Sequence, residues 1–262
     1  MRMSDSRFLP MAGVHNFRDY GGYALAGGGR LRRGVLWRSG QHHEASDADL
    51  AAIDSLAISD VFDLRSDRER ASHPCARPAG FAGQIHLIAD GTTTLAPHVA
   101  AASSLRRDAE STRANMRRSY DGMPYRPKLN QAISQYLRVL AEGRGASVIN
   151  CMAGKDRTGF AVAMLHHAVG VHWDDILADY LLTNVAGDQE ARIAAGRRSV
   201  ANIVGDIDDD ALRVLMGVEA AYLETAFAKI REDHGTVDAY QAAVLGVDAA
   251  LRERLRGALA QG

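Results

Sequence analysis

Cysteine is scarce in this chain of 262 residues, which contains only Cys75 and Cys151. Two cysteines so far apart in sequence do not form the disulfide framework of a small secreted domain. The ten histidines show neither zinc-finger nor EF-hand spacing. We therefore expect no metal site and no cofactor. The cysteine usage is consistent with a reducing, cytoplasmic location.

Net charge and long hydrophobic runs are also lacking. The chain has 31 Lys and Arg against 32 Asp and Glu, so no global electrostatic field attracts nucleic acid. No apolar run is long enough to span a bilayer, and residues 1–16 lack the apolar core of a signal peptide. With 47% hydrophobic residues the chain can bury one sizeable core. We expect a single domain over residues 1–262, with no nucleic-acid partner and no integral membrane association.

The strongest functional signal lies in residues 151–159, which read Cys-Met-Ala-Gly-Lys-Asp-Arg-Thr-Gly between an apolar strand pattern at 146–150 and a helical pattern at 160–169. In a strand–loop–helix unit, backbone N–H groups and the helix dipole favour a bound anion. A cysteine there is expected to be a thiolate, and the planar guanidinium of Arg157 matches two phosphate oxygens. The spacing predicts a cysteine-dependent phosphatase in which Cys151 attacks phosphorus.

The run resembles the signature loop of the protein tyrosine phosphatase superfamily. Its ending at 154–159 is similar to that of a bacterial subgroup of atypical dual- or triple-specificity tyrosine and lipid phosphatases. The resemblance extends to residues 16–19, 33–40, 63–66 and 179–184. It implies a phosphocysteine intermediate and hydrolysis of phosphotyrosine, with phosphoserine, phosphothreonine and phosphoinositides as further substrates. The superfamily usually has histidine before the nucleophile, whereas this chain has Asn150, which can donate a hydrogen bond but carries no charge.

The predicted phosphate-binding groups are the backbone N–H groups of the loop together with the Arg157 side chain, where negative charge develops in the transition state. Thr158 is expected to donate its hydroxyl to the Cys151 thiolate. Lys155 either provides a positive charge for a multiply charged substrate or anchors the loop to a nearby carboxylate. The loop residues assigned to phosphate are Met152, Ala153, Gly154, Lys155, Asp156 and Arg157.

Three aspartates are candidates for the general acid that protonates the leaving group. Asp156 lies within the loop, and the resemblance to the bacterial subgroup points to it. Asp121 lies upstream of Cys151 across one predicted helix and one strand, an order that resembles the acid loop of dual-specificity phosphatases. Asp63 ends a predicted strand. Each has a structural alternative: a helix N-terminal charge for Asp156, a turn residue for Asp121 and a partner of arginine for Asp63.

The order of predicted elements indicates an α/β fold with a small, mostly parallel central sheet flanked by helices. We expect a hairpin over residues 20–37, a helix capped by Ser46, strands at 58–64 and 84–89, and a helix over 129–140. Residues 66–80 read as a loop, and residues 91–125 as an irregular basic segment that either guides anionic substrates or forms a solvated helical face. The C-terminal part, 171–262, reads as helical, and the resemblance implies that some of it forms a lid.

Two other functions remain open from the sequence. Asn150 and the uncertain general acid favour a catalytically weak phosphate-binding module. An anion-cradled cysteine also occurs in sulfur-transfer and arsenate-reducing enzymes, but the Arg157-Thr158-Gly159 ending argues against that class. The expected partner is a phosphorylated protein or a phosphoinositide.

Overall fold

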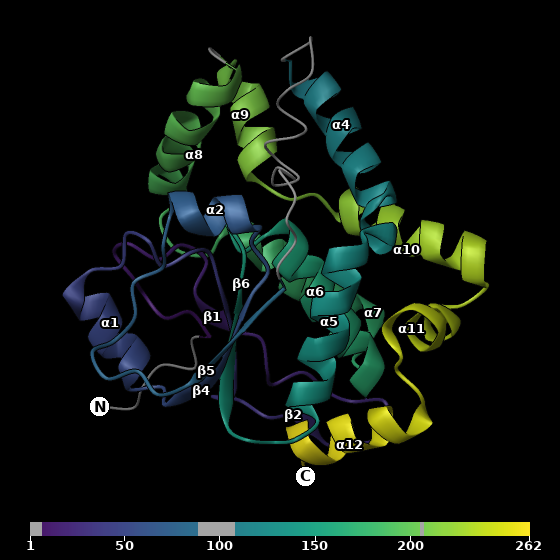
Figure 1. Cartoon of the computed structure of the whole chain (residues 1–262). Helices are drawn as coiled ribbons and strands as arrows, with labels where there is room; N and C mark the ends of the chain where they lie inside the picture. The colour runs from purple at the N-terminus through teal and green to yellow at the C-terminus, as the bar shows by residue number, and fades with distance from the viewer. Residues whose placement is uncertain (1–6, 89–107, 205–206) are drawn as a thin grey trace.

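A five-stranded sheet forms the centre of the computed structural model, which describes residues 7–88, 108–204 and 207–262. The strand order is β1-β3-β6-β4-β5, and every neighbouring pair is parallel except β1 with β3. This arrangement confirms the predicted α/β fold (Figure 1). The strands are β1 (Arg18–Asp19), β3 (Leu36–Ser39), β6 (Ala146–Asn150), β4 (Ile58–Asp63) and β5 (Gln84–Leu87).

Both faces of the central strands β4 and β6 are buried, and their side chains alternate between two cores. Val61 and Val148 pack on one face with Ile53 of helix α1 (Asp47–Asp54). Phe62 and Ile149 pack on the other face in the larger core, which includes α5 (Pro127–Leu140) and α6 (Asp156–Val169). At the carboxyl edge, Ser39 and Asp63 are the register partners of Asn150, so three parallel strands end together directly before the loop that begins at Cys151.

Helices surround the sheet, and α8 and α9 stand side by side above α2 in Figure 1. The central helix α6 buries every residue except His167, as expected for a helix that is covered on all sides. The helices are α1 (Asp47–Asp54), α2 (Asp67–Ser72), α4 (Ala109–Asp121), α5 (Pro127–Leu140), α6 (Asp156–Val169), α7 (Trp173–Leu181), α8 (Gln189–Val204), α9 (Asp209–Met216), α10 (Ala220–His234), α11 (Val237–Leu245) and α12 (Ala249–Leu259). Single 3₁₀ turns occupy η1 (Met123–Tyr125) and η2 (Leu182–Asn184).

Most of the predicted elements are confirmed. Ser46 caps α1 in a capping box with Asp49. The strands at 58–63 and 84–87, the helix ending at 140 and the helical C-terminal part are present. The predicted hairpin is only partly formed: β2 (Arg30–Leu31) turns back on Ala24, but it pairs with β7 (Ala260–Gln261), and β3 joins the main sheet instead.

One expectation was wrong. Residues 67–72 form α2 rather than loop, because Ser66 and Glu69 make a reciprocal capping box. The basic segment predicted at 91–125 is not irregular throughout, because residues 109–121 follow its helical alternative and form α4. Its buried side chains Thr112, Met116 and Tyr120 recur every four residues among many charges. Residues 89–107, the start of the predicted basic segment, lie outside the described residues.

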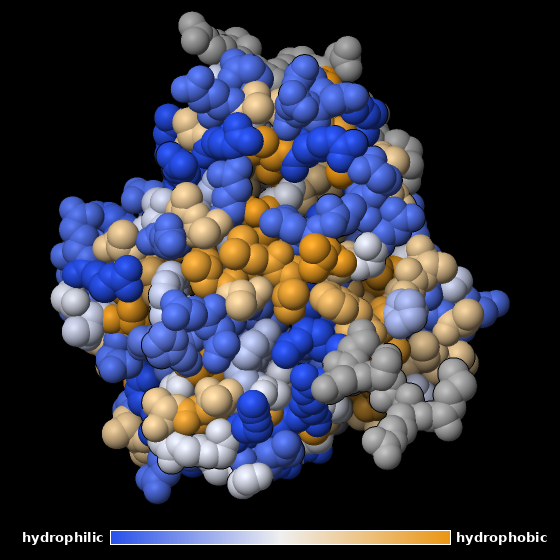
Figure 2. Space-filling model, turned by 180° about the vertical axis from the view of Figure 1, so that it is seen from behind, coloured by the Kyte–Doolittle hydropathy of each residue, from blue (hydrophilic) through white to orange (hydrophobic). Residues whose placement is uncertain are grey.

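The surface seen from behind is mostly hydrophilic, with a central patch of hydrophobic residues (Figure 2). Among the helices of the described ranges, none combines the length and the hydropathy needed to cross a membrane.

Candidate active site

Cys151 directly follows the central strand β6 and is only 3% exposed. Its loop turns tightly at Gly154, which has φ +65°; a Cβ there would lie 2.3 Å from the carbonyl oxygen of Ser39, so only glycine fits. Helix α6 begins at Asp156, earlier than the sequence pattern indicated, and places Arg157 and Thr158 in its first turn. The N–H groups of a first turn have no acceptor within the helix. The loop and the helix terminus thus lie at the carboxyl edge of the sheet, where the sequence predicts an anion cradle.

Arg157 is held by Glu69 of α2. Its Nη1 donates to Glu69 Oε2 at 2.7 Å and to the Leu64 carbonyl at 3.1 Å, while its Nη2 donates to Glu69 Oε1 at 2.6 Å. Burial alone would lower the pKa of Arg157, but the charge and hydrogen bonds of Glu69 outweigh burial and raise it. Both ends of the fork that we expected to bind phosphate therefore contact a carboxylate, and Arg157 is permanently charged.

Three buried polar atoms near Cys151 have no hydrogen-bond partner among the described residues: Arg157 Nε, Thr158 Oγ1 and Asn150 Oδ1. An unsatisfied buried polar group costs about 1–3 kcal/mol, so such groups are uncommon. The first two can donate a hydrogen bond to an anion. The predicted bond from Thr158 to Cys151 is therefore not formed in this structure, and the hydroxyl stays available.

Asp156 is 2% exposed and accepts two hydrogen bonds at one carboxylate oxygen. Lys155 Nζ and the Tyr120 hydroxyl each donate to Oδ1 at 2.9 Å. Lys155 is completely buried and also donates to the Gly217 carbonyl at 3.2 Å. Of its two predicted roles, Lys155 therefore performs the anchoring one in this structure.

A second buried tyrosine supports the contact between Tyr120 and Asp156. The Tyr180 hydroxyl donates to that of Tyr120 at 2.8 Å. Burial, followed by the charge of Asp156, raises the pKa of both tyrosines well above the ordinary value. Both hydroxyls consequently stay protonated, and Tyr120 acts as a hydrogen-bond donor.

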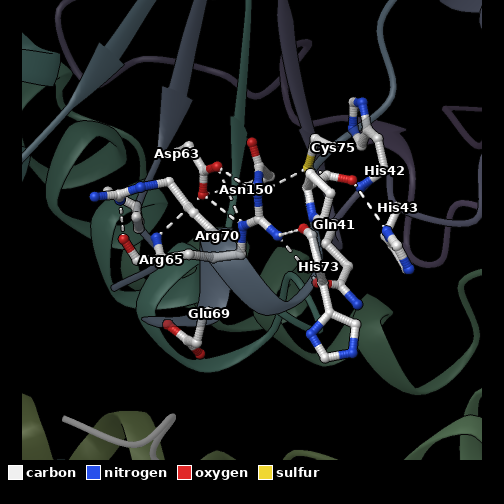
Figure 3. Close-up of polar contacts among 12 residues, drawn as sticks. Gln41, His42, His43, Asp63, Arg65, Glu69, Arg70, His73, Cys75 and Asn150 are labelled. Carbon is white, nitrogen blue, oxygen red and sulfur yellow. Dashed lines mark hydrogen bonds and ion pairs between the residues drawn. The ribbon is translucent and has the colours of Figure 1, made fainter. Parts of the chain in front are cut away.

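Asp63 accepts hydrogen bonds from two neighbouring side chains. Arg65 binds both of its carboxylate oxygens, at 2.7–3.1 Å, and Asn150 Nδ2 donates to Oδ1 at 3.2 Å. Figure 3 shows Arg65 at the centre of this cluster, where it also contacts Gln41 at 3.1 Å and the Cys75 sulfur at 3.0 Å. Asp63 thus pairs with an arginine, as the structural alternative to a general-acid role predicted.

Asp121, unlike Asp63 and Asp156, is exposed, and it lies at the C-terminal end of α4. Its charge contributes to raising the pKa of Tyr125 to about 12, an effect that follows mainly from burial and from Asp233. Within the described ranges no hydrogen bond or ion pair joins it to Cys151 or Asp156.

Sequence reasoning missed Glu69 and Tyr120. The signal for Glu69 was the Ser66-x-x-Glu69 capping box, and that for Tyr120 was the four-residue spacing of apolar side chains on α4. Within 7–88, 108–204 and 207–262, no group of three or more His, Cys, Asp or Glu is placed to hold a metal ion.

Comparison with known proteins extends over nearly the whole chain. Residues 9–261 match the model of the tyrosine phosphatase family. A protein of Cupriavidus necator, provisionally named a tyrosine-protein phosphatase, is 35% identical over 251 residues, which cover 93% of this chain and 85% of that protein. The triple specificity protein phosphatase PtpB of Mycobacterium tuberculosis is 34% identical over 281 aligned positions, which cover 97% of this chain and 98% of that protein.

Proposed function

This chain belongs to the tyrosine phosphatase family and is a phosphoric monoester hydrolase, and we propose that it acts through a phosphocysteine intermediate on Cys151. The proposal rests mainly on one observation. Arg157 Nε and the Thr158 hydroxyl are buried donors without partners in the described structure, next to a cysteine at a helix N-terminus. A phosphoryl group bound there would satisfy Arg157 Nε, and the Cys151 thiolate would satisfy the Thr158 hydroxyl.

In the first step the Cys151 thiolate attacks phosphorus, an S–P bond forms and the bond from phosphorus to the leaving oxygen breaks. Loop N–H groups and Arg157 stabilise the charge on the equatorial oxygens. The leaving oxygen takes a proton from Asp156, the candidate acid nearest the loop. In the second step water attacks phosphorus and gives its proton to Asp156, the S–P bond breaks and inorganic phosphate leaves. The Thr158 hydroxyl then stabilises the departing thiolate.

Phosphotyrosine is the proposed substrate, with phosphoserine, phosphothreonine and phosphoinositides as further candidates. The similarity to a protein named for triple specificity supports the broader range. We also propose that the protein works in a reducing compartment such as the cytoplasm, because a nucleophilic thiol is inactivated by oxidation.

A catalytically weak phosphate-binding protein is the second candidate, and a specific contact favours it. Asp156 accepts from the cationic Lys155, which favours the ionised carboxylate over the protonated acid that the first step needs. Asn150 also supplies no positive charge beside the nucleophile.

The two candidates differ in turnover. Phosphate release should be measured side by side from p-nitrophenyl phosphate, from matched peptides with phosphotyrosine, phosphoserine or phosphothreonine, and from phosphoinositide vesicles, with and without EDTA. The phosphatase hypothesis predicts EDTA-resistant turnover that Cys151→Ser abolishes while inorganic phosphate still binds. Equal turnover by Cys151→Ser would exclude cysteine catalysis, whereas phosphate binding without turnover in the unmodified protein would favour the binding module.

A further inference from the structure

The carbonyl of Gly154, in the loop after Cys151, is fixed by two buried side chains from the N-terminal part of the chain. Asn16 Nδ2 donates to it at 2.7 Å and Arg38 Nη2 at 3.0 Å. Asn16 Nδ2 also lies 3.4 Å from the Ala153 carbonyl. Asn16 is 1% exposed and Arg38 is completely buried, so these bonds do not compete with water.

A buried ion network holds the two donors in place. Arg38 Nη1 forms an ion pair with Asp179 Oδ2 at 2.7 Å. Arg18 donates to the Asp179 backbone carbonyl at 2.9 Å and to the side-chain oxygen of Asn16. Burial raises the pKa of Asp179, but the charges of Arg18 and Arg38 outweigh burial and hold it below its ordinary value. Burial and then Arg38 lower the pKa of Arg18 to about 9.

We propose that Asn16 and Arg38, braced by Asp179, are positioning residues that orient the phosphate loop for anion binding. In a trans peptide the C=O and the following N–H point in opposite directions. Fixing the carbonyls of Ala153 and Gly154 toward Asn16 and Arg38 therefore turns the N–H groups of Gly154 and Lys155 the other way, toward the cradle. This inference rests on the proposed function, because it assigns those N–H groups to phosphate.

The backbone of Asn16 supports a role beyond filling space. It has φ +61°, one of two positive φ values among the described non-glycine residues. Such a conformation is uncommon for non-glycine residues, although asparagine tolerates it better than most. With this backbone conformation, the Asn16 amide is placed to donate to the Gly154 carbonyl.

The sharpest test is Asn16→Gly, because glycine keeps the positive φ while the amide donors disappear. The matched control is Ala57→Gly, at the other positive φ of the described non-glycine residues, in the turn between α1 and β4. Binding of inorganic phosphate is measured by calorimetry in the Cys151→Ser background, and kcat and KM are measured with Cys151 intact.

We expect Asn16→Gly to weaken phosphate binding about tenfold and to lower kcat by a similar factor, while Ala57→Gly changes neither by more than twofold. Asn16→Gly within twofold of the unmodified protein in both measurements would overturn the inference. If Asn16→Gly does not fold, Asn16→Asp carries the same test, because a carboxylate offers no donor to the Gly154 carbonyl.

Arg38→Lys gives an independent measurement. An ammonium at this position keeps the charge but cannot span the Gly154 carbonyl and Asp179 as the guanidinium fork does. Weaker phosphate binding in this variant supports the inference, and unchanged binding contradicts it. Phosphate binding is measured without turnover, so the two proposals can fail separately. If the phosphatase proposal fails, the native chain releases no phosphate; if the positioning proposal fails, the variants bind phosphate as tightly as the native chain.

Discussion

Glu69 accepts a hydrogen bond from each terminal nitrogen of Arg157, at 2.6 and 2.7 Å, across 88 residues of sequence. Glu69 is itself fixed, because the Ser66 backbone N–H donates to it at 2.7 Å in the cap of α2. A six-residue helix therefore sets the direction of the Arg157 guanidinium. Since Glu69 binds both terminal nitrogens and Nη1 also donates to the Leu64 carbonyl, the unpartnered Nε–H is the donor that we propose for phosphate.

We predict that Glu69→Gln lowers kcat/KM by about 10- to 100-fold, because hydrogen bonds to charged groups contribute about 1.5–3 kcal/mol and the neutral amide must turn its NH₂ toward Arg157. The measurement is steady-state hydrolysis of a phosphotyrosine peptide. Glu190→Gln is the control, since Glu190 pairs with Arg213 on the exposed surface. A Glu69→Gln enzyme as active as the control would mean that Arg157 does not need this partner.

Tyr120→Phe should shift the pH dependence of kcat. The hydroxyl donates to Asp156 at 2.9 Å and so favours the ionised carboxylate. Without that bond the acid keeps its proton to higher pH, so the alkaline limb of kcat should move upward by as much as about one pH unit. The substrate should be phenyl phosphate, whose poor leaving group requires the acid.

The control for this shift is Tyr240→Phe. The Tyr240 hydroxyl is buried and hydrogen-bonded to the Pro124 carbonyl and to Asn130, away from Asp156. An alkaline limb that stays fixed in Tyr120→Phe would argue that Asp156 is not the group that titrates in catalysis.

Asn150→His should lower the pH at which Cys151 is alkylated by iodoacetamide. The residue lies beside the nucleophile and donates to Asp63, so an imidazolium there would have a carboxylate partner and would favour the anionic sulfur. A shift of one pH unit corresponds to about 1.4 kcal/mol. If the alkylation midpoint does not move and turnover falls, Asn150 is required for packing of the strand end.

Stability should fall as the pH drops below about 6.5 because of His42. This side chain is 1% exposed, its Nδ1 accepts from Arg77 at 3.2 Å, and burial lowers its pKa from 6.5 to about 3. Between about pH 6.5 and pH 3, His42 is protonated in the unfolded chain but neutral in the folded chain. The free energy of unfolding therefore loses about 2 kcal/mol from this group between pH 7.5 and pH 5.

Urea titrations of the native chain and of His42→Gln measure this contribution. The variant should show a smaller fall in unfolding free energy over that pH range, although it starts from a lower value. His166 and His167 also have lowered pKa values because of burial, so part of the slope should remain. An unaltered slope in His42→Gln would show that His42 does not titrate on unfolding.

The elements that the sequence revealed are those built from local patterns. The apolar run of β6, the Ser46 cap and the stripe of α5 each need only neighbouring residues, and all three were predicted. For the segment that contains α4, a helix was one of two alternatives, because its many charges obscured a narrow buried stripe. The loop itself was identified from the types and spacing of Cys151 and Arg157.

The partners of the loop could not be derived in the same way. Glu69, Asn16 and Arg38 contact it through pairings of distant segments, which depend on the order of strands in the sheet. The resembling segments at 16–19, 33–40 and 179–184 identified the right regions without assigning contacts. The burial of Lys155 and its contact with Asp156 show that it anchors the loop. Burial depends on the whole fold, so neighbouring residues in the sequence do not reveal it.

The fixing of the Gly154 carbonyl by Asn16 and Arg38 has a consequence for biosynthesis. Contacts between residues so distant in sequence form late, because their loop-closure entropy is lost before the contacts are gained. A nascent chain that has emerged only as far as α6 already carries Cys151 but lacks Asp179 and Gly217, which brace Arg38 and Lys155. Cys151 is therefore synthesised before the contacts that orient its loop can form. Under the proposed mechanism, the chain would become a catalyst only when its C-terminal half has folded back onto its N-terminal half.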